Sequence, residues 1–263
     1  MMKIKWIIFF STSLYFCPLK AQYLDMLSSN DKRNFYKSSS YDSLQKKTTF
    51  PYKSFILPAF MIAYGFTAIY NDELADINEE IKEEVWTETP HKKVSIDNYL
   101  QFAPAVAVYG LNLAGIKGKN NLGDRSMIYL ISNIFLNTTV TSLKSLTGQQ
   151  RPDGSSRSFP SGHTAEAFAS AEFMRQEYKD VSPWYGVAGY AAATATGLLR
   201  IYNNKHWLSD VVAGAGIGIA STKLAYLIYP VIKRRFFKTK KMNTILVPYY
   251  QNGSTGIVMV HHF

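Results

Sequence analysis

The chain has 263 residues, of which 47% are hydrophobic and 14% aromatic, and its formal net charge is +10. This length and apolar content are enough for one large core, and no break in composition divides the chain. The positive charge favours an anionic partner, such as a phosphorylated lipid or an acidic membrane surface. We do not expect nucleic acid, because the basic residues form short clusters between apolar runs and no nucleic-acid-binding motif is present.

The first 21 residues have the pattern of an export signal. Two lysines precede an apolar run over 6–17, and the small residue Ala21 lies at the expected cleavage site. Cleavage would remove three lysines, which lowers the net charge from +10 to +7, together with Cys17, the one cysteine. The mature chain is therefore expected to be exported and to have no thiol chemistry. The alternative is an uncleaved membrane anchor, although the run is shorter than the ~20 residues that a span needs.

Helices are expected over most of the remaining chain, after a polar and irregular lead-in over 22–54. The uncharged run 54–71 predicts one helix, and the acidic segment 72–88 predicts an amphipathic helix with a hydrated acidic face rather than a metal site. Another helix is expected to begin at His163, and a last one over 211–232, where Gly and Ala allow close packing. Three further uncharged runs predict helices over 98–116, 126–143 and 181–199.

These segments predict an all-α fold, a bundle of about six core helices, within a domain over 55–241. The tail over 242–263 changes character, because Asn252-Gly253 lies between two β-rich runs and predicts a short β-hairpin. His261 and His262 are interpreted as tail residues, since no further metal ligand is in view.

One segment between two of the predicted helices is rich in residue types that bind anions or transfer protons. From Lys144 to His163 it reads KSLTGQQRPDGSSRSFPSGH, which combines cations, glycines and hydroxyls. Lys144 and Arg151 supply positive charge, and the planar fork of an arginine can bind two oxygens of one phosphate. The PSGH motif at 160–163 opens an apolar run, so its backbone N–H groups are expected at a helix N-terminus, where anions are stabilised. The segment predicts a phosphate site.

A second cluster contains Arg200, His206 and Asp210. His206 and Asp210 are four residues apart, so at the start of a helix they share one face. The carboxylate can then keep one imidazole nitrogen protonated and leave the other free as a nucleophile. Taken singly, Arg200 is also compatible with a salt bridge and His206 with a packed surface residue, and Pro160-Ser161-Gly162 of the first segment is compatible with an ordinary turn and helix cap.

The order and spacing of both clusters resemble the three-part signature of the type 2 phosphatidic acid phosphatase family. Its superfamily also contains bacterial class A acid phosphatases and vanadium haloperoxidases. The signature covers residues 144–210, and the helical layout extends the resemblance to 55–232. Leu199 departs from the pattern, because the family often has serine before the arginine of the third motif. One hydrogen bond to the phosphate is then missing, but no catalytic group is lost.

The resemblance implies that His206 attacks phosphorus to form a phosphohistidine and that Asp210 orients His206. It implies that His163 protonates the departing alcohol and later activates water. No metal and no cofactor is expected, since three cations already stabilise the phosphate. The implied phosphate-binding residues are Lys144, Arg151, Ser161, Gly162 and Arg200.

Whether the helices cross a bilayer is left open. If all six cross, the basic loops 117–125, 175–179 and 233–241 share one side, as the positive-inside rule requires. Six crossings would also place the start of the mature chain on the cytoplasmic side, which conflicts with a cleaved signal. A mean hydropathy of −0.10 and the charge of Lys223 favour helices packed on one another, with partial or peripheral membrane contact. In both cases the expected site faces away from the cytoplasm.

We therefore expect a metal-independent phosphatase of the cell envelope that acts on a phosphate monoester. The apolar helices, the aromatic content and the basic surface favour a lipid phosphate presented at a membrane. The sequence does not choose among phosphatidate, phosphatidylglycerophosphate, a polyprenyl diphosphate and the phosphates of lipid A. One alternative is a soluble, non-specific acid phosphatase, which needs neither membrane nor detergent. A vanadate-dependent haloperoxidase is disfavoured by the short chain. A non-catalytic envelope protein is disfavoured because every ionisable group of the signature is retained.

Overall fold

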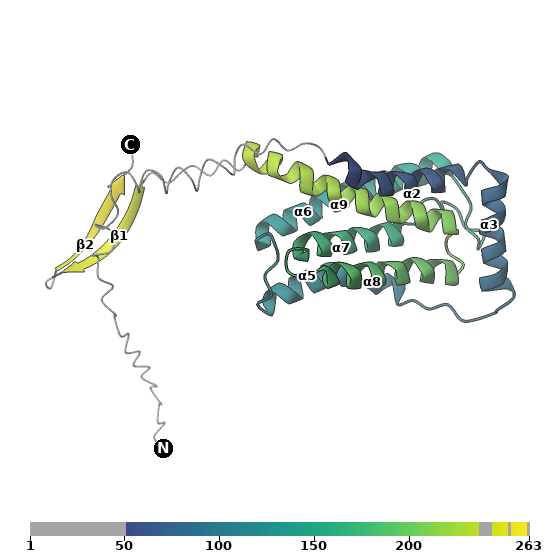
Figure 1. The fold of residues 1–263 in the computed structure, drawn as a ribbon, viewed down its shortest axis with the longest axis horizontal. Helices are drawn as coiled ribbons and strands as arrows, with labels where there is room; N and C mark the ends of the chain where they lie inside the picture. The colour runs from purple at the N-terminus through teal and green to yellow at the C-terminus, as the bar shows by residue number, and fades with distance from the viewer. Residues whose placement is uncertain (1–50, 237–243, 252–253, 262–263) are drawn as a thin grey trace, which may run out of the picture. The chain divides into compact units, whose positions relative to one another are not determined.

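The structure, a computed structural model, describes residues 51–236, 244–251 and 254–261 of the chain (Figure 1). The predicted signal peptide (1–21) and most of the predicted lead-in (22–54) lie outside the described residues. Those two assignments, and the domain boundary at 241, stay predictions.

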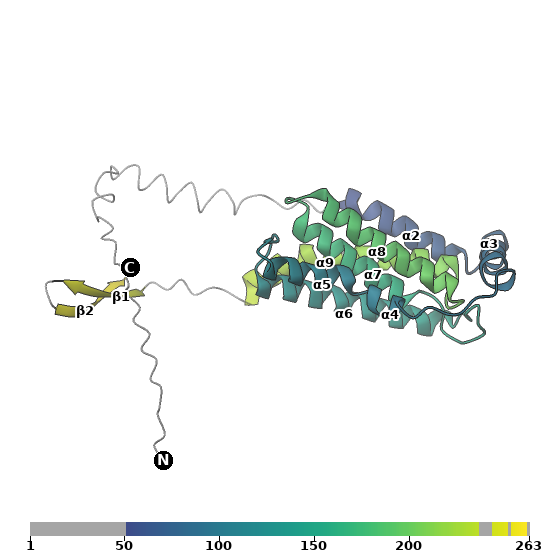
Figure 2. The same ribbon diagram turned by 90° about the horizontal axis from the view of Figure 1, so that it is seen from below.

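Residues 51–236 form helices joined by loops and contain no strand, which confirms the all-α prediction for this part of the chain. The predicted core helices correspond to α2, α5, α6, α7, α8 and α9 (Figures 1 and 2). A short turn η2 precedes α2, and α3 continues into the π-helical turn η3. The bounds are η2 Tyr52–Phe55, α2 Ile56–Thr67, α3 Asp72–Lys82, η3 Glu83–Thr87, α4 Asp97–Leu100, α5 Ala103–Leu113, α6 Leu122–Thr147, α7 Gly162–Tyr178, α8 Pro183–Tyr202 and α9 Leu208–Phe236.

One predicted boundary is wrong. The run 98–116 was expected to form a single helix, but the structure divides it into α4 and α5. Pro104 lies in the first turn of α5 and has no backbone N–H, so a continuous helix would lack a hydrogen bond there. The side chain of Gln101 instead donates to the carbonyl of Asn98 at 2.8 Å. The break makes α4 a separate short element.

Strand β1 (Thr244–Gln251) pairs antiparallel with β2 (Ser254–His261). The Asn252-Gly253 turn that was predicted to join them lies outside the described residues. The C-terminal hairpin as a whole stays a prediction.

Capping residues set where the helices begin and end. Oδ1 of Asn121 accepts the N–H of Asp124 at 2.9 Å and starts α6. Gly148 ends α6 in the left-handed conformation, with a φ of 58°. These caps lengthen α6 beyond the predicted run 126–143, so that Lys144 lies in its last turn.

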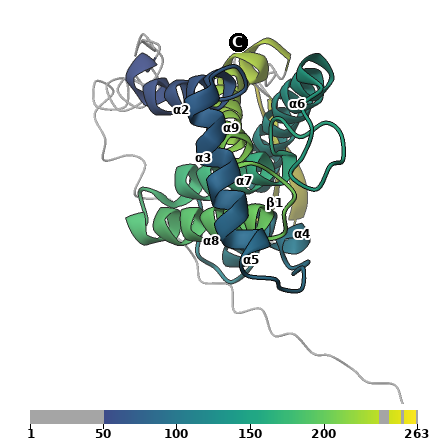
Figure 3. The same cartoon turned by 90° about the vertical axis from the view of Figure 1, so that its right-hand side faces the viewer.

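Helix α7 is the centre of the bundle, since it packs against α5, α6, α8 and α9. In contrast, α3 crosses one end of the bundle (Figures 1 and 3), and the segment that contains it is bent by 89° from the segment of α2. The side chain of Asn78 fastens α3 to α9, because it donates to Oγ of Ser209 at 3.0 Å and accepts the N–H of Ser209 at 3.1 Å. This end of the bundle is therefore covered and fixed.

Close packing of α9 on α7 depends on glycine. A Cβ at Gly218 would lie 2.1 Å from the carbonyl oxygen of Ala165, and one at Gly214 would lie 2.5 Å from that of Ser161. Both obstacles are backbone atoms, one in α7 and one at its N-cap, and they cannot move aside as a flexible side chain would. The Gly-rich start of α9 therefore allows the close approach that the sequence predicted.

The substitution Gly218→Ala should lower the free energy of unfolding by about 2–4 kcal/mol, because the added methyl group forces α7 and α9 apart. The matched control is Gly110→Ala in α5, where an added Cβ meets nothing within 4 Å. This control should raise stability by about 0.5–1 kcal/mol through helix propensity alone. Denaturation of both variants checks the prediction, and equal changes would contradict it.

One helix of the described chain, over Leu208–Arg235, is long and apolar enough to cross a membrane, and 61% of its most apolar window is buried in the bundle. Helices α2 and α3 meet the same criterion only as one bent pair.

Candidate active site

The loop between α6 and α7 is held against the end of α6. Nζ of Lys144 donates to the carbonyl oxygens of Arg157 at 2.7 Å and Ser158 at 2.9 Å. Within the loop, the N–H of Ser158 donates to the carbonyl of Gln149 at 2.8 Å. Lys144, which was predicted to bind phosphate, thus also fixes the loop that carries Arg151.

Two contacts join this loop to the segment between α8 and α9. Nζ of Lys205 lies 2.8 Å from Oδ2 of Asp153, and the indole N–H of Trp207 donates to the carbonyl of Gln150 at 2.8 Å. Although the two segments are more than 50 residues apart in the sequence, the fold places them side by side. The two clusters that were predicted separately therefore form one site.

The backbone of both segments is strained near the site. Arg157 has a φ of 62° and Asn204 a φ of 55°, conformations that non-glycine residues adopt rarely. Arg157 lies in the loop after α6, and Asn204 lies two residues before His206. Strain of this kind costs about 1–3 kcal/mol per residue and concentrates at functional sites, so it supports the location.

His206 and Asp210 form the buried pair that their spacing predicted. Nδ1 of His206 lies 3.2 Å from Oδ2 of Asp210, and the two residues are 2% and 0% exposed. Because a carboxylate only accepts, Nδ1 carries the hydrogen and Nε2 keeps its lone pair. The same oxygen Oδ2 accepts the backbone N–H of Trp207 at 3.0 Å and the hydroxyl of Ser158. These contacts fix the tautomer and the orientation of the imidazole.

Burial lowers the pKa of His206 to about 4, and the hydrogen bond to Asp210 only partly opposes this shift. Lys144 and Arg200 also repel a proton on this imidazole. His206 is therefore neutral at neutral pH, which is the state that a nucleophile requires.

Arg151 and Arg200 each have a guanidinium N–H group that is not used in a hydrogen bond within the described structure. Arg200 is 8% exposed, and its Nη1 donates to Oδ2 of Asp97 at 2.6 Å. In the described structure, the buried Nε atoms of Arg151 and of Arg200 have no hydrogen-bond partner. A buried donor without a partner is costly, so these two N–H groups are suited to bind an anion such as phosphate.

The PSGH motif begins α7 as predicted. Oγ of Ser161 accepts the N–H of Thr164 at 3.4 Å, which makes Ser161 the N-cap, and the hydroxyl also contacts Oγ1 of Thr164 at 2.9 Å. Gly162 is the first residue of α7, where backbone N–H groups point away from the helix. The structure thus uses the Ser161 hydroxyl locally, and its role toward phosphate stays a prediction.

His163 lies in the first turn of α7, where its Nε2 donates to Oδ1 of Asn98 at 2.9 Å. Burial, followed by the charge of Arg200, lowers the pKa of His163 to about 4. Without a bound anion, His163 is therefore neutral and is not yet a general acid. A phosphate dianion among these cations would raise this pKa toward neutrality.

Three residues of the site were not predicted: Asp97, Asn98 and Ser158. Asp97 holds Arg200, Asn98 holds His163, and Ser158 contacts both His206 and Asp210, its hydroxyl lying 3.4 Å from Nδ1 of His206. No sequence signal pointed to the first two, because Asp97 and Asn98 are 103 and 65 residues from the side chains that they contact. Ser158 had no signal beyond its place in the loop.

Among the residues that the structure describes, no group of three or more His, Cys, Asp or Glu side chains could hold a metal ion. Catalysis without a metal stays a proposal.

The sequence of residues 125–234 matches the family model described as the PAP2 superfamily. The lipid A 1-phosphatase of Porphyromonas gingivalis is 36% identical over 188 residues. That match covers 69% of this chain but 42% of the relative, so the chain spans less than half the length of that protein.

Two solved structures also match this chain in part. LpxE of Aquifex aeolicus is 20% identical, with a TM-score of 0.45, over 57% of this chain and 95% of that one. The transmembrane PAP2-type phosphatidylglycerolphosphate phosphatase of Bacillus subtilis is 17% identical, with a TM-score of 0.46, over 68% and 98%.

Proposed function

Given that the chain belongs to the PAP2 superfamily, we propose that it is a metal-independent phosphatase that hydrolyses phosphate monoesters of lipids. The observation that carries this proposal is the buried His206–Asp210 pair together with two arginines, Arg151 and Arg200, whose buried Nε donors have no partner among the described residues. The lipid phosphatase among its relatives supports the same class of reaction.

The tautomer of His206 gives the first step. Nε2 attacks phosphorus, a phosphorus–nitrogen bond forms, and the bond between phosphorus and the alcohol oxygen breaks. His163, protonated once phosphate is bound, gives its proton to the departing oxygen. In the second step His163 takes a proton from water, the water oxygen bonds to phosphorus, the phosphorus–nitrogen bond to His206 breaks, and inorganic phosphate leaves. Asp210 stabilises the imidazolium character of His206 during both steps.

The cations stabilise the negative charge on the equatorial oxygens of the transferred group. Arg151 and Arg200 present their buried Nε donors, and Lys144 adds a third charge. The N–H of Gly162 and the hydroxyl of Ser161 complete the oxygen contacts at the start of α7. Asp97 and Asn98 position Arg200 and His163.

An apolar hollow lined by chain neighbours of the catalytic residues supports a lipid as the substrate. Its volume is about 590 Å³, and it lies between the α3–η3 segment and the outer face of α8. Two of its lining residues are close in sequence to residues of the site: Leu199 directly precedes Arg200, and Leu208 follows His206 by two positions. An acyl chain attached to the phosphate could enter it. The lining residues are Ile81, Val85, Ala195, Leu198, Leu199, Ile201, Tyr202 and Leu208.

Exposed apolar side chains support membrane contact. Such residues recur on the outer faces of several helices, and a soluble monomer rarely exposes so many large apolar groups together. We propose that these faces contact lipid and that the enzyme acts in the cell envelope, with its site away from the cytoplasm. The residues include Phe60 at 69%, Val106 at 65%, Leu146 at 80%, Trp184 at 74% and Leu198 at 59% exposure.

The test of this function is phosphate release by the purified full chain from a panel of lipid and water-soluble phosphate esters, with EDTA present throughout. We expect lipid monoesters in mixed micelles to be hydrolysed fastest and vanadate to inhibit. Equal turnover of soluble esters without detergent would favour the non-specific acid phosphatase. Strict dependence on an added divalent ion would exclude the site as described.

Replacing Leu198 by glutamine should raise KM for a lipid phosphate by about tenfold, because a polar group then enters the apolar hollow. Hydrolysis of a short soluble ester should not change, since Leu198 does not contact the phosphate site. Val187→Gln is the matched control, because Val187 lies on the same helix with 54% exposure against 59% for Leu198. Steady-state kinetics of both variants on both substrates check the prediction, and a parallel loss with both substrates would contradict it.

A further inference from the structure

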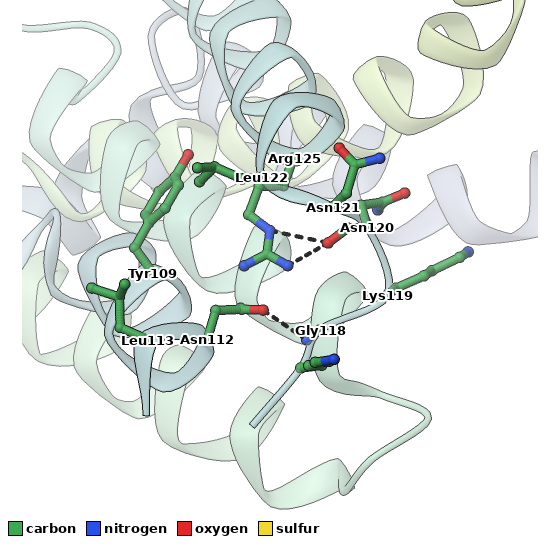
Figure 4. Close-up of a pocket in the computed structure, with 10 residues that line it drawn as sticks. Tyr109, Asn112, Leu113, Gly118, Lys119, Asn120, Asn121, Leu122 and Arg125 are labelled. Carbon is green, nitrogen blue, oxygen red and sulfur yellow. Dashed lines mark hydrogen bonds between the residues drawn. The ribbon is translucent and has the colours of Figure 1, made fainter. Parts of the chain in front are cut away.

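A second hollow lies at the end of the bundle opposite the phosphate site. Its volume is about 740 Å³, and it is formed by the end of α5, the connecting loop and the start of α6 (Figure 4). Helix α7 begins at the phosphate site and ends beside this loop, so its 17 residues separate the two places by about 25 Å. The hollow is therefore not part of the catalytic site. Its lining residues include Tyr109, Leu113, Lys117, Lys119, Leu122 and Arg125.

The loop that forms this hollow is held in place from three sides. Oδ1 of Asn112 accepts the N–H of Gly118 at 3.1 Å, and the Asn112 amide donates to the hydroxyl of Tyr178 at 2.6 Å. The N–H of Asn120 donates to Glu177 at 3.0 Å. Figure 4 shows the guanidinium of Arg125 directed at the carbonyl of Asn120, to which its Nε donates at 3.2 Å. The hollow is preformed, so ligand binding would not have to order the loop.

The cations at this end differ in their partners. Lys233 pairs with Asp124 at 2.6 Å, and Arg125 lies 3.8 Å from Glu177. Lys117 and Lys119, by contrast, have no acidic partner among the described residues. Both line the hollow, and Figure 4 shows Lys119 extending outward at its rim. Two positive charges at the mouth of the hollow are therefore available to an anion.

The same hollow is bordered by exposed apolar side chains. Leu113, at the end of α5, is 91% exposed, and Leu122, at the start of α6, is 67% exposed. A ligand that satisfies both features has an anionic group for the two lysines and an apolar part for the two leucines. We propose that this hollow binds an anionic phospholipid, with its phosphate at Lys117 and Lys119 and its acyl chains against Leu113 and Leu122. The site is independent of the hydrolysis proposed above.

The experiment measures binding rather than turnover, so it remains valid if the proposed function is wrong. The purified full chain, in a nonionic detergent, is titrated calorimetrically with short-chain phosphatidylglycerol, with phosphatidylcholine of the same chains, and with glycerol 3-phosphate. The variant carries Lys117→Gln and Lys119→Gln, and the matched control carries Lys92→Gln and Lys93→Gln. All four lysines are exposed, and Lys92 and Lys93 lie beyond η3, towards the catalytic end.

We expect wild type to bind phosphatidylglycerol more tightly than either other ligand. The Lys117/Lys119 variant should lose about thirtyfold in affinity for phosphatidylglycerol, and the control should bind as wild type does. Hydrolysis of a soluble ester should be the same in all three proteins. Unchanged phosphatidylglycerol binding in the variant, or equally tight binding of glycerol 3-phosphate, would overturn the proposal.

Discussion

Replacing His206 by alanine is expected to abolish phosphate release, with a loss of roughly 10⁴-fold or more in kcat. The reason is that Nε2 of His206 is the one nucleophile in the proposed site. The remaining cations would still bind the substrate, so KM should change far less than kcat. Steady-state kinetics on a lipid phosphate, under conditions that saturate wild type, measure both quantities.

Because His206 is 2% exposed, the control must separate chemistry from folding. His206→Asn keeps a polar group beside Asp210 and should be as inactive as the alanine variant while unfolding near the wild-type temperature. His91→Ala is the matched control, since the ring of His91 stacks on Tyr202 at 3.6 Å near the same end of the bundle without belonging to the site. Substantial activity in either His206 variant would exclude the mechanism.

Arg200→Lys is expected to lower kcat/KM by about 10²–10³-fold. One nitrogen of the guanidinium is engaged by Asp97 at 2.6 Å, and the buried Nε remains available for phosphate. A lysine has one ammonium group and cannot hold both partners with the geometry of a fork. The charge is retained, so the loss would report geometry rather than electrostatic attraction alone.

Arg175→Lys is the matched control for this substitution. Arg175 also binds a buried carboxylate, at 2.6 Å from Glu172, but lies towards the other end of α7. Arg175→Lys should lower the free energy of unfolding about as much as Arg200→Lys does, but it should keep the wild-type kcat/KM. Asp97→Asn adds a second comparison, because it removes the charge that holds Arg200 and should cost about tenfold in kcat/KM. If Arg200→Lys remained as active as Arg175→Lys, Arg200 would not bind the phosphate.

Much of the fold could be predicted because the information is local. Uncharged runs of helical length predicted four of the core helices, the PSGH motif predicted the start of α7, and the Gly-rich start of α9 predicted a close contact. The break between α4 and α5 was missed because Pro104 is compatible with the first turn of a helix and does not by itself mark where that helix begins. The crossing direction of α3 depends on the Asn78–Ser209 contact, which joins residues 131 positions apart.

In the site, too, contacts between residues close in sequence could be predicted, and contacts between distant residues could not. His206 and Asp210 could be paired from their spacing, because both lie near one helix start. Asp97 and Asn98 could not be assigned, since they meet Arg200 and His163 only after α4 folds over the ends of α7 and α8. The depressed pKa of His163 was also not predictable, because it follows from burial and from the proximity of Arg200.

The most direct test of the central claim is to detect the phosphohistidine itself. The purified full chain is mixed with a lipid phosphate, quenched within the first turnover at alkaline pH, digested and analysed by mass spectrometry. We predict one phosphoryl group on the peptide that contains His206, which decays as inorganic phosphate appears and is absent from His206→Asn. Turnover by wild type with the phosphoryl group on another residue, or with no covalent intermediate under these conditions, would contradict the account.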